Sequence, residues 1–305
     1  MKGVLINRLR SWGNKFIGLI MFLVCLVAIY NKVAHNENLN QYGSEIKIQI
    51  EKITFFEWGI LILLFLFNYF MEAIKWQNLL ASWNPISLFK SYKSVLIGQA
   101  FAFFTPVRSG DYVGRILLLP AGSKMKGVAQ LAWSSYAQLI ITISIGSIAL
   151  FFNLPFFPWI KWCMPIVLLA ALWVYFHPGQ FKGWMNKINK LQIDQSLKLN
   201  LLILSFLKYI IFVLQYTWAV KMLSIPITNF DLWIALGVLF LLLSIIPAIS
   251  LTDLVIRGQL IVVLLEPYYS NSLMLICLST IIWAVNFLLP AIIGAVLLIN
   301  FRVKQ

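Results

Sequence analysis

The sequence predicts an all-α integral membrane protein that forms a single polytopic domain over residues 1–305. Hydrophobic residues make up 61% of the chain and charged residues only 11%, whereas soluble domains carry about 25% charged residues. Several apolar runs reach the roughly 17–25 residues that a helix needs to cross a bilayer. A soluble protein could not cover so much apolar side-chain area, so we expect lipid to surround most of the chain.

About six apolar segments are expected to cross the membrane completely. They lie near residues 16–33, 54–74, 127–152, 159–176, 199–220 and 272–299. The basic residues before segment 16–33 are also typical of a cleaved signal peptide. However, Lys32 occupies position −3 of a cleavage site that would end at Ala34, where a small residue is needed, so we expect this segment to remain as the first span.

Two further apolar regions, 86–119 and 231–265, are interrupted near their middle by proline, serine and charged residues. Proline lacks a backbone N–H and disfavours helix at the residue before it. We therefore expect two short helices in each region, with the helix breaks at Pro106, Gly110 and Pro247. A break at membrane depth is tolerated only where protein or a water-filled cavity covers it. Each region is either a re-entrant hairpin or a pair of full crossings.

The loop charges predict the orientation of the chain. With both termini cytoplasmic, 15 of the 24 Lys and Arg residues fall in cytoplasmic segments and five fall outside, while four lie within apolar regions. This bias follows the positive-inside rule, although it does not distinguish re-entry from two full crossings. With this topology, the halves near 54–152 and 199–299 each contain a span, a broken region and a span. We expect them to form an inverted repeat, as in many transporters.

The two breaks carry matching charges. Asp111 and Arg115 follow the first break, and Asp253 and Arg257 follow the second. Residues at i and i+4 share a helix face and can pair. Arginine binds phosphate through two parallel hydrogen bonds, and two half-helix N-termini could add to such a site. The candidate head-group-binding residues are Arg108, Arg115, Arg257, Asp111 and Asp253. Alternatively, the Asp–Arg pairs serve only to lock the two hairpins together.

Other polar residues inside apolar regions have simpler interpretations. Lys208 lies within segment 199–220 and is expected to extend its ammonium group towards the membrane surface. The side chains of Asn68, Gln99 and Asn286 are expected either to line the cavity or to form hydrogen bonds between helices.

Several function classes are not expected. The sequence lacks a nucleophile elbow, a phosphate-binding loop, a zinc-protease motif and paired catalytic carboxylates, so we expect neither enzymatic activity nor a cofactor. The formal net charge of +14 is explained by basic residues at the ends of apolar segments, so no nucleic-acid partner is expected. Cysteines and histidines are widely spaced and predict no metal site.

The segment FTPVRSGDYVGRILLL, residues 104–119, resembles a motif of a known family. The family is the flippase-like transmembrane domain of lysylphosphatidylglycerol synthases and their stand-alone relatives, and the order of apolar segments agrees over roughly residues 15–300. Pro106, Arg108, Gly110, Asp111 and Arg115 occupy matching positions, with Asp111 where common members carry Glu. The resemblance implies lipid handling in the bacterial cytoplasmic membrane. We do not expect the synthase activity, which belongs to a separate cytosolic domain.

The sequence thus predicts a lipid translocase or lipid-binding membrane protein, with a phospholipid or an isoprenoid-linked lipid as its partner. Its phosphate-bearing head group would occupy a cavity between the two broken hairpins. A second hypothesis is a non-transporting membrane partner of a separate envelope glycosyltransferase or lipid-modifying enzyme.

Overall fold

The computed structural model describes residues 39–105, 108–153, 158–177 and 193–299, together with residues 23, 26, 27 and 30. Within these ranges the secondary structure is helical, without a strand, which confirms the predicted all-α class. The helices are α2 (Leu39–Lys52), α3 (Phe55–Leu80), α4 (Leu88–Phe104), α5 (Gly110–Ile116), α6 (Lys124–Asn153), α7 (Pro158–Phe176), α9 (Gln195–Met222), α10 (Asn229–Ile245), α11 (Ser250–Leu265), α12 (Ser272–Trp283) and α13 (Leu289–Ile299). The 3-10 turn η2 (Ala121–Ser123) precedes α6, and the π-helical segment η4 (Ala284–Leu288) joins α12 to α13.

Four helical stretches in the described ranges are long and apolar enough to cross a membrane. They are Phe55–Leu80, Lys124–Phe152, Gln195–Met222 and Ser272–Ile299, and they correspond to four of the six predicted spans. The expected span 159–176 is also helical, as α7, and its described apolar part, Cys163–Phe176, is shorter. The expected span 16–33 lies mostly outside the described residues.

Both interrupted regions form two helices, as expected. In the first, α4 ends at Phe104 and α5 begins at Gly110; Pro106 lies outside the described residues. In the second, α10 ends at Ile245 and α11 begins at Ser250, so Pro247 lies within the break. The helices α4 and α10 each contain 17 residues, and each begins after a hydroxyl residue, Ser87 or Thr228, that caps it.

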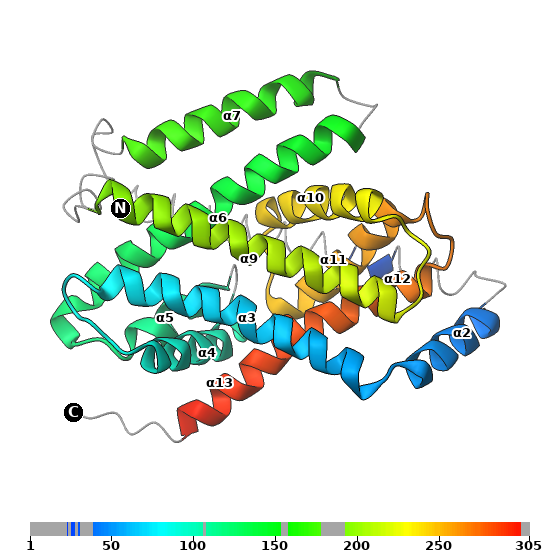
Figure 1. The fold of residues 1–305 in the computed structure, drawn as a ribbon, viewed down its shortest axis with the longest axis horizontal. Helices are drawn as coiled ribbons and strands as arrows, with labels where there is room; N and C mark the ends of the chain where they lie inside the picture. The colour runs from blue at the N-terminus through cyan, green and yellow to red at the C-terminus, as the bar shows by residue number, and fades with distance from the viewer. Residues whose placement is uncertain are drawn as a thin grey trace.

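The two halves of the chain, near 54–152 and 199–299, exchange packing partners. Helix α4 packs along α13, whereas α10 packs along α6, so the first arm of each broken pair contacts the last helix of the other half. Helices α3 and α9 pack against each other at the centre and run in opposite directions (Figure 1). Helix α7 contacts α6 at the edge of the bundle (Figure 1).

Glycines make the two exchanged contacts possible. A Cβ atom on Gly294 of α13 would lie 2.0 Å from the carbonyl oxygen of Leu96 in α4. A Cβ atom on Gly146 of α6 would lie 2.7 Å from the Cβ atom of Leu241 in α10. Since real Cβ atoms do not approach other heavy atoms so closely, both helix crossings require glycine at these positions.

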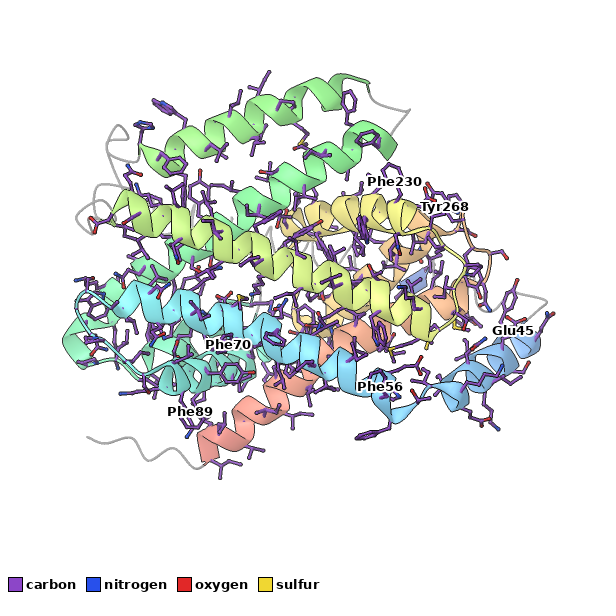
Figure 2. All side chains as sticks on the ribbon, viewed as in Figure 1. Glu45, Phe56, Phe70, Phe89, Phe230 and Tyr268 are labelled. Atoms are coloured by element: carbon purple, nitrogen blue, oxygen red, sulfur yellow. The ribbon has the colours of Figure 1, made fainter. Side chains whose placement is uncertain are left out.

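The outer surface of the bundle is apolar. Phe56 and Phe89 are 73% and 70% exposed, and Figure 2 shows Phe89 beside Phe70 at the edge of α3 and α4. A groove of about 550 Å³ there is lined only by hydrophobic and aromatic side chains: Leu63, Leu66, Phe67, Phe70, Leu88, Phe89 and Tyr92. An exposed apolar surface of this kind is suited to lipid and not to water.

The polar segment 34–53, between the expected spans 16–33 and 54–74, contains helix α2. The helix is held to the rest of the bundle by Asn271, which caps α12 through its side-chain oxygen and donates a 2.9 Å hydrogen bond to Glu45. Helix α2 also packs against α12, and a helix of only 14 residues is marginal in water without such tertiary contacts.

Candidate functional site

A cavity of about 460 Å³ lies between the two broken helix pairs and the central helices α3 and α9. All five predicted head-group residues line it, although residues 108 and 257 are far apart in the sequence. The charged lining residues are Glu72, Lys75, Arg108, Asp111, Arg115, Lys208, Asp253 and Arg257. Folding therefore brings both charged motifs to one site, together with three charged residues from α3 and α9.

The first motif, Asp111 and Arg115, forms a bidentate ion pair. Arg115 donates to Asp111 through Nε at 2.9 Å and through Nη2 at 2.7 Å. Its third nitrogen, Nη1, donates to Glu72 of α3 at 2.9 Å. The side chain of Arg115 is only 3% exposed, and all three of its nitrogens are occupied. Arg115 therefore joins α5 to α3 through Glu72, while Asp111 of its own helix orients its guanidinium group.

The second motif repeats this geometry. Arg257 donates to Asp253 through Nε at 3.2 Å and through Nη2 at 3.0 Å. Its side chain is also buried, with 6% exposure. The i, i+4 pairing predicted for both motifs is present, so each aspartate orients its own arginine within the cavity wall.

Glu72 is the centre of a charge cluster that sequence reasoning missed. Its Oε2 atom accepts hydrogen bonds from Lys208 of α9 at 2.6 Å and from Lys75 at 3.5 Å, while Oε1 accepts from Arg115. The interpretation of Lys208 as reaching for the membrane surface was wrong, since its ammonium group pairs with Glu72. One signal was available: a glutamate in an apolar run, three residues before a lysine, is the spacing of a helical ion pair.

Arg108 differs from the other two arginines. It has a positive φ of 56° and donates to the neutral side-chain oxygen of Gln99. Gln99 in turn donates to Asp111 at 3.1 Å. Among the residues that the structure describes, none offers Arg108 a carboxylate within ion-pair distance. In the described ranges, Arg108 is connected to Asp111 through the side-chain amide of Gln99.

The π-helical segment η4 contributes two residues to the cavity, Asn286 and Phe287. The guanidinium carbon of Arg108 lies 4.2 Å from the centre of the Phe287 ring, and that of Arg257 lies 5.1 Å from the same centre. Short π-helical segments within α-helices are frequent at functional sites. Phe287 was not predicted, because a phenylalanine in an apolar run is indistinguishable from a lipid-facing or core residue.

Several residues that line the cavity carry a buried, uncharged polar atom without a protein partner in the described ranges. These are Ser134 Oγ, Gln138 Oε1, Tyr209 OH and Asn286 Oδ1. Asn68, by contrast, bonds between helices as expected, donating to the Lys208 carbonyl at 3.2 Å. Buried polar atoms that lack a protein partner usually bond to water or to a ligand.

Glycines of the first broken pair bring its two arms together. Gly114 of α5 lies so close to α4 that a Cβ atom there would be 2.4 Å from Gly98 Cα. A Cβ atom on Gly110 would lie 2.3 Å from the carbonyl of Phe101. This close approach places Asp111 beside Gln99 and explains why glycine, rather than another small residue, begins α5.

A second pocket, of about 610 Å³, adjoins the first at the second break. It is formed by the segment around Pro247 and shares Arg108, Asp253 and Phe287 with the main cavity. Ile245, at its edge, is 68% exposed. The charged cavity therefore continues to the surface of the bundle beside the second break.

Comparison with protein-family models, with curated proteins and with solved structures gives no match to this chain. The resemblance of residues 104–119 to the flippase-like family stays a prediction.

Proposed function

We propose that this chain is a membrane-embedded lipid translocase or lipid-binding protein that receives a phosphate-bearing head group in its central cavity. One observation carries the proposal: five cations and three carboxylates line a cavity enclosed by apolar helices. A charge at mid-bilayer costs about 2.5–3.5 kcal/mol on insertion scales. A surplus of two cations is therefore expected to serve an anionic ligand.

The two halves are proposed to be related by an inverted repeat. Leu96 and Gly237, which meet Gly294 and Gly146, are each the ninth residue of their helices, α4 and α10. Gly146 and Gly294 are each the 23rd residue counted from the start of α6 and of α12. Such equivalence, together with the exchanged packing, favours a two-fold axis between the halves.

The contact between the central helices also favours this axis. Asn68 bonds to Lys208, and each is the 14th residue of its helix, α3 or α9. Contacts between equivalent residues occur where a two-fold axis passes. Since α3 and α9 run in opposite directions (Figure 1), the axis would lie in the membrane plane, as in transporters with inverted repeats.

The helix lengths favour re-entry of the first broken pair. At 1.5 Å per residue, the seven residues of α5 extend about 10 Å, much less than the roughly 30 Å hydrocarbon core. The 17-residue helices α4 and α10 extend about 25 Å each. We propose that both pairs enter the membrane and place their breaks beside the cavity, where protein covers the unpaired backbone groups.

A head group in the cavity would leave its acyl chains in the surrounding lipid. The pocket at the second break connects the charged lining to the exposed edge at Ile245, and the bundle exterior is apolar. Movement of the head group between leaflets would then follow a shielded polar path while the chains remain in hydrocarbon. Lipid handling in a bacterial cytoplasmic membrane is also what the resemblance of residues 104–119 implies.

The test is transport of a head-group-labelled phosphatidylglycerol in liposomes that contain the purified protein. Replacement of Arg108 with Gln is expected to slow transport by about tenfold or more, because it removes a charge-assisted contact to phosphate. Arg108 is the better target than Arg115, whose three bonds to protein make its loss a folding defect.

Lys93→Gln is the matched control. Lys93 is an exposed cation on α4 that contacts Phe89 outside the cavity, so this variant should transport at the wild-type rate. Absence of transport by folded wild-type protein would contradict the translocase. Equal rates for wild type and Arg108→Gln would contradict the assignment of the cavity. If folded wild-type protein does not transport lipid, a non-transporting partner of an envelope enzyme becomes the better hypothesis.

A further inference from the structure

The ring of Phe287 brings together arginines from the two broken helix pairs. Arg108 follows α4 and Arg257 belongs to α11, and their guanidinium carbons lie 4.2 Å and 5.1 Å from the centre of this one ring. Cation–π contacts stabilise a guanidinium group without neutralising its charge. Phe287 therefore holds two positive charges near each other, where they would otherwise repel.

The carboxylates of the cavity are all committed to protein cations. Asp111 pairs with Arg115, Asp253 pairs with Arg257, and Glu72 pairs with Lys75, Lys208 and Arg115. A cationic or zwitterionic head group would find no free carboxylate among the described lining residues. Asp111 and Asp253, which were candidate head-group residues, therefore serve to orient the arginines.

The formal charge of the lining, five cations against three carboxylates, is +2. A phosphodiester carries one negative charge, whereas a phosphomonoester carries about 1.5 to 2 near neutral pH and has three acceptor oxygens. Ser134 Oγ, Gln138 Oε1 and Asn286 Oδ1 have no protein partner in the described ranges and could accept hydrogen bonds from water around such a group.

We infer that the cavity selects a phosphomonoester, the doubly charged terminal phosphate of a lipid, over singly charged phosphodiesters and zwitterionic head groups. The basis is the pair of arginines on Phe287 and the surplus of two cations. This inference rests on the proposed function and narrows its substrate class. The same chemistry could come from a lipid or from a soluble phosphate ester, and the experiment separates these sources.

The experiment measures binding of phosphatidate with a fluorescent acyl chain to the purified full-length chain in detergent micelles. Unlabelled phosphatidate, phosphatidylglycerol, phosphatidylethanolamine and glycerol 3-phosphate serve as competitors. Phosphatidate is expected to compete at about tenfold lower concentration than phosphatidylglycerol near pH 7.5, and this preference should shrink near pH 5.5, where a phosphomonoester loses its second charge. Glycerol 3-phosphate is expected to compete weakly, because the lipid chains add apolar contacts.

Phe287→Leu is the decisive variant and Lys93→Gln is its control. Phe287→Leu keeps an apolar side chain but loses the cation–π contacts, so the preference for phosphatidate over phosphatidylglycerol should fall several-fold. Thermal unfolding verifies that the variant is folded, and Arg108→Gln provides a second test of the same charge pair if it is not. Lys93→Gln should keep the wild-type preference.

The outcomes separate the inference from the function on which it rests. Equal competition by phosphatidate and phosphatidylglycerol at both pH values would overturn the selectivity and leave lipid binding intact. Failure of folded wild-type protein to bind any of the lipids would overturn the proposed function itself. Competition by glycerol 3-phosphate as strong as that by phosphatidate would support the phosphomonoester and assign it to a soluble source.

Discussion

Replacing Glu72 with Gln is expected to lower the free energy of unfolding by about 3–5 kcal/mol, the usual cost of removing one partner from a buried ion pair. Glu72 is 7% exposed and is the common partner of Lys75, Lys208 and Arg115. After the substitution, Arg115 keeps Asp111, but Lys75 and Lys208 lose the only carboxylate that the structure places within their reach in the described ranges. Thermal unfolding in detergent, followed by tryptophan fluorescence, measures the loss.

A second substitution tests the cause of this loss. Lys208→Gln should restore part of the stability of Glu72→Gln, because it removes one of the uncompensated charges, whereas Lys208→Gln alone should be destabilising. This double-mutant cycle isolates the interaction between α3 and α9. Additive effects of the two substitutions would contradict the role assigned to the Glu72–Lys208 pair.

Introducing a methyl group at Gly294 is expected to be the most damaging small substitution in the described helices. The new Cβ atom would meet the backbone carbonyl of Leu96 at 2.0 Å, so α13 and α4 would have to separate. Overpacking of this kind typically costs about 1–3 kcal/mol, occasionally more. Gly294→Ala should therefore unfold at a clearly lower temperature than the wild type.

Two other glycines provide comparisons: Gly146, at the equivalent helix crossing, and Gly59, which has open space around it. Gly146→Ala should also destabilise the chain, but less than Gly294→Ala, because its closest contact is the side chain of Leu241 at 2.7 Å. Gly59→Ala, with no heavy atom within 4 Å of the new Cβ atom, should be neutral or stabilising by up to about 1 kcal/mol through helix propensity. The same unfolding temperature for all three variants would contradict the exchanged packing.

The sequence predicts the helices well because lipid-facing helices can be identified by their length and apolar composition. Segments 127–152 and 199–220 lie inside α6 and α9, and segment 54–74 begins one residue before α3 and ends inside it. The second break was also predictable, because Pro247 lacks a backbone N–H and disfavours helix at the residue before it. The first predicted span, 16–33, lies mostly outside the described residues and stays a prediction.

The candidate site was only partly predictable. The two Asp–Arg pairs are local, at i and i+4, so the sequence shows them directly. The Glu72–Lys208 pair depends on α3 packing against α9, a contact between distant segments that spacing does not encode. Phe287 could not be predicted from the sequence either. Its role depends on the π-helical segment η4, which lies in an apolar run of ordinary helical composition.

The central claim is that a lipid phosphate occupies the cavity between the two broken helix pairs. Photo-crosslinking tests it most directly, using a phospholipid that carries a diazirine beside its phosphate, with labelled peptides identified by mass spectrometry. Adducts are expected on α4 near Gln99, on α11 near Arg257 and on η4 near Phe287, and they should be lost in Arg108→Gln but not in Lys93→Gln. Adducts confined to the outer apolar surface around Phe89, unchanged by Arg108→Gln, would contradict it.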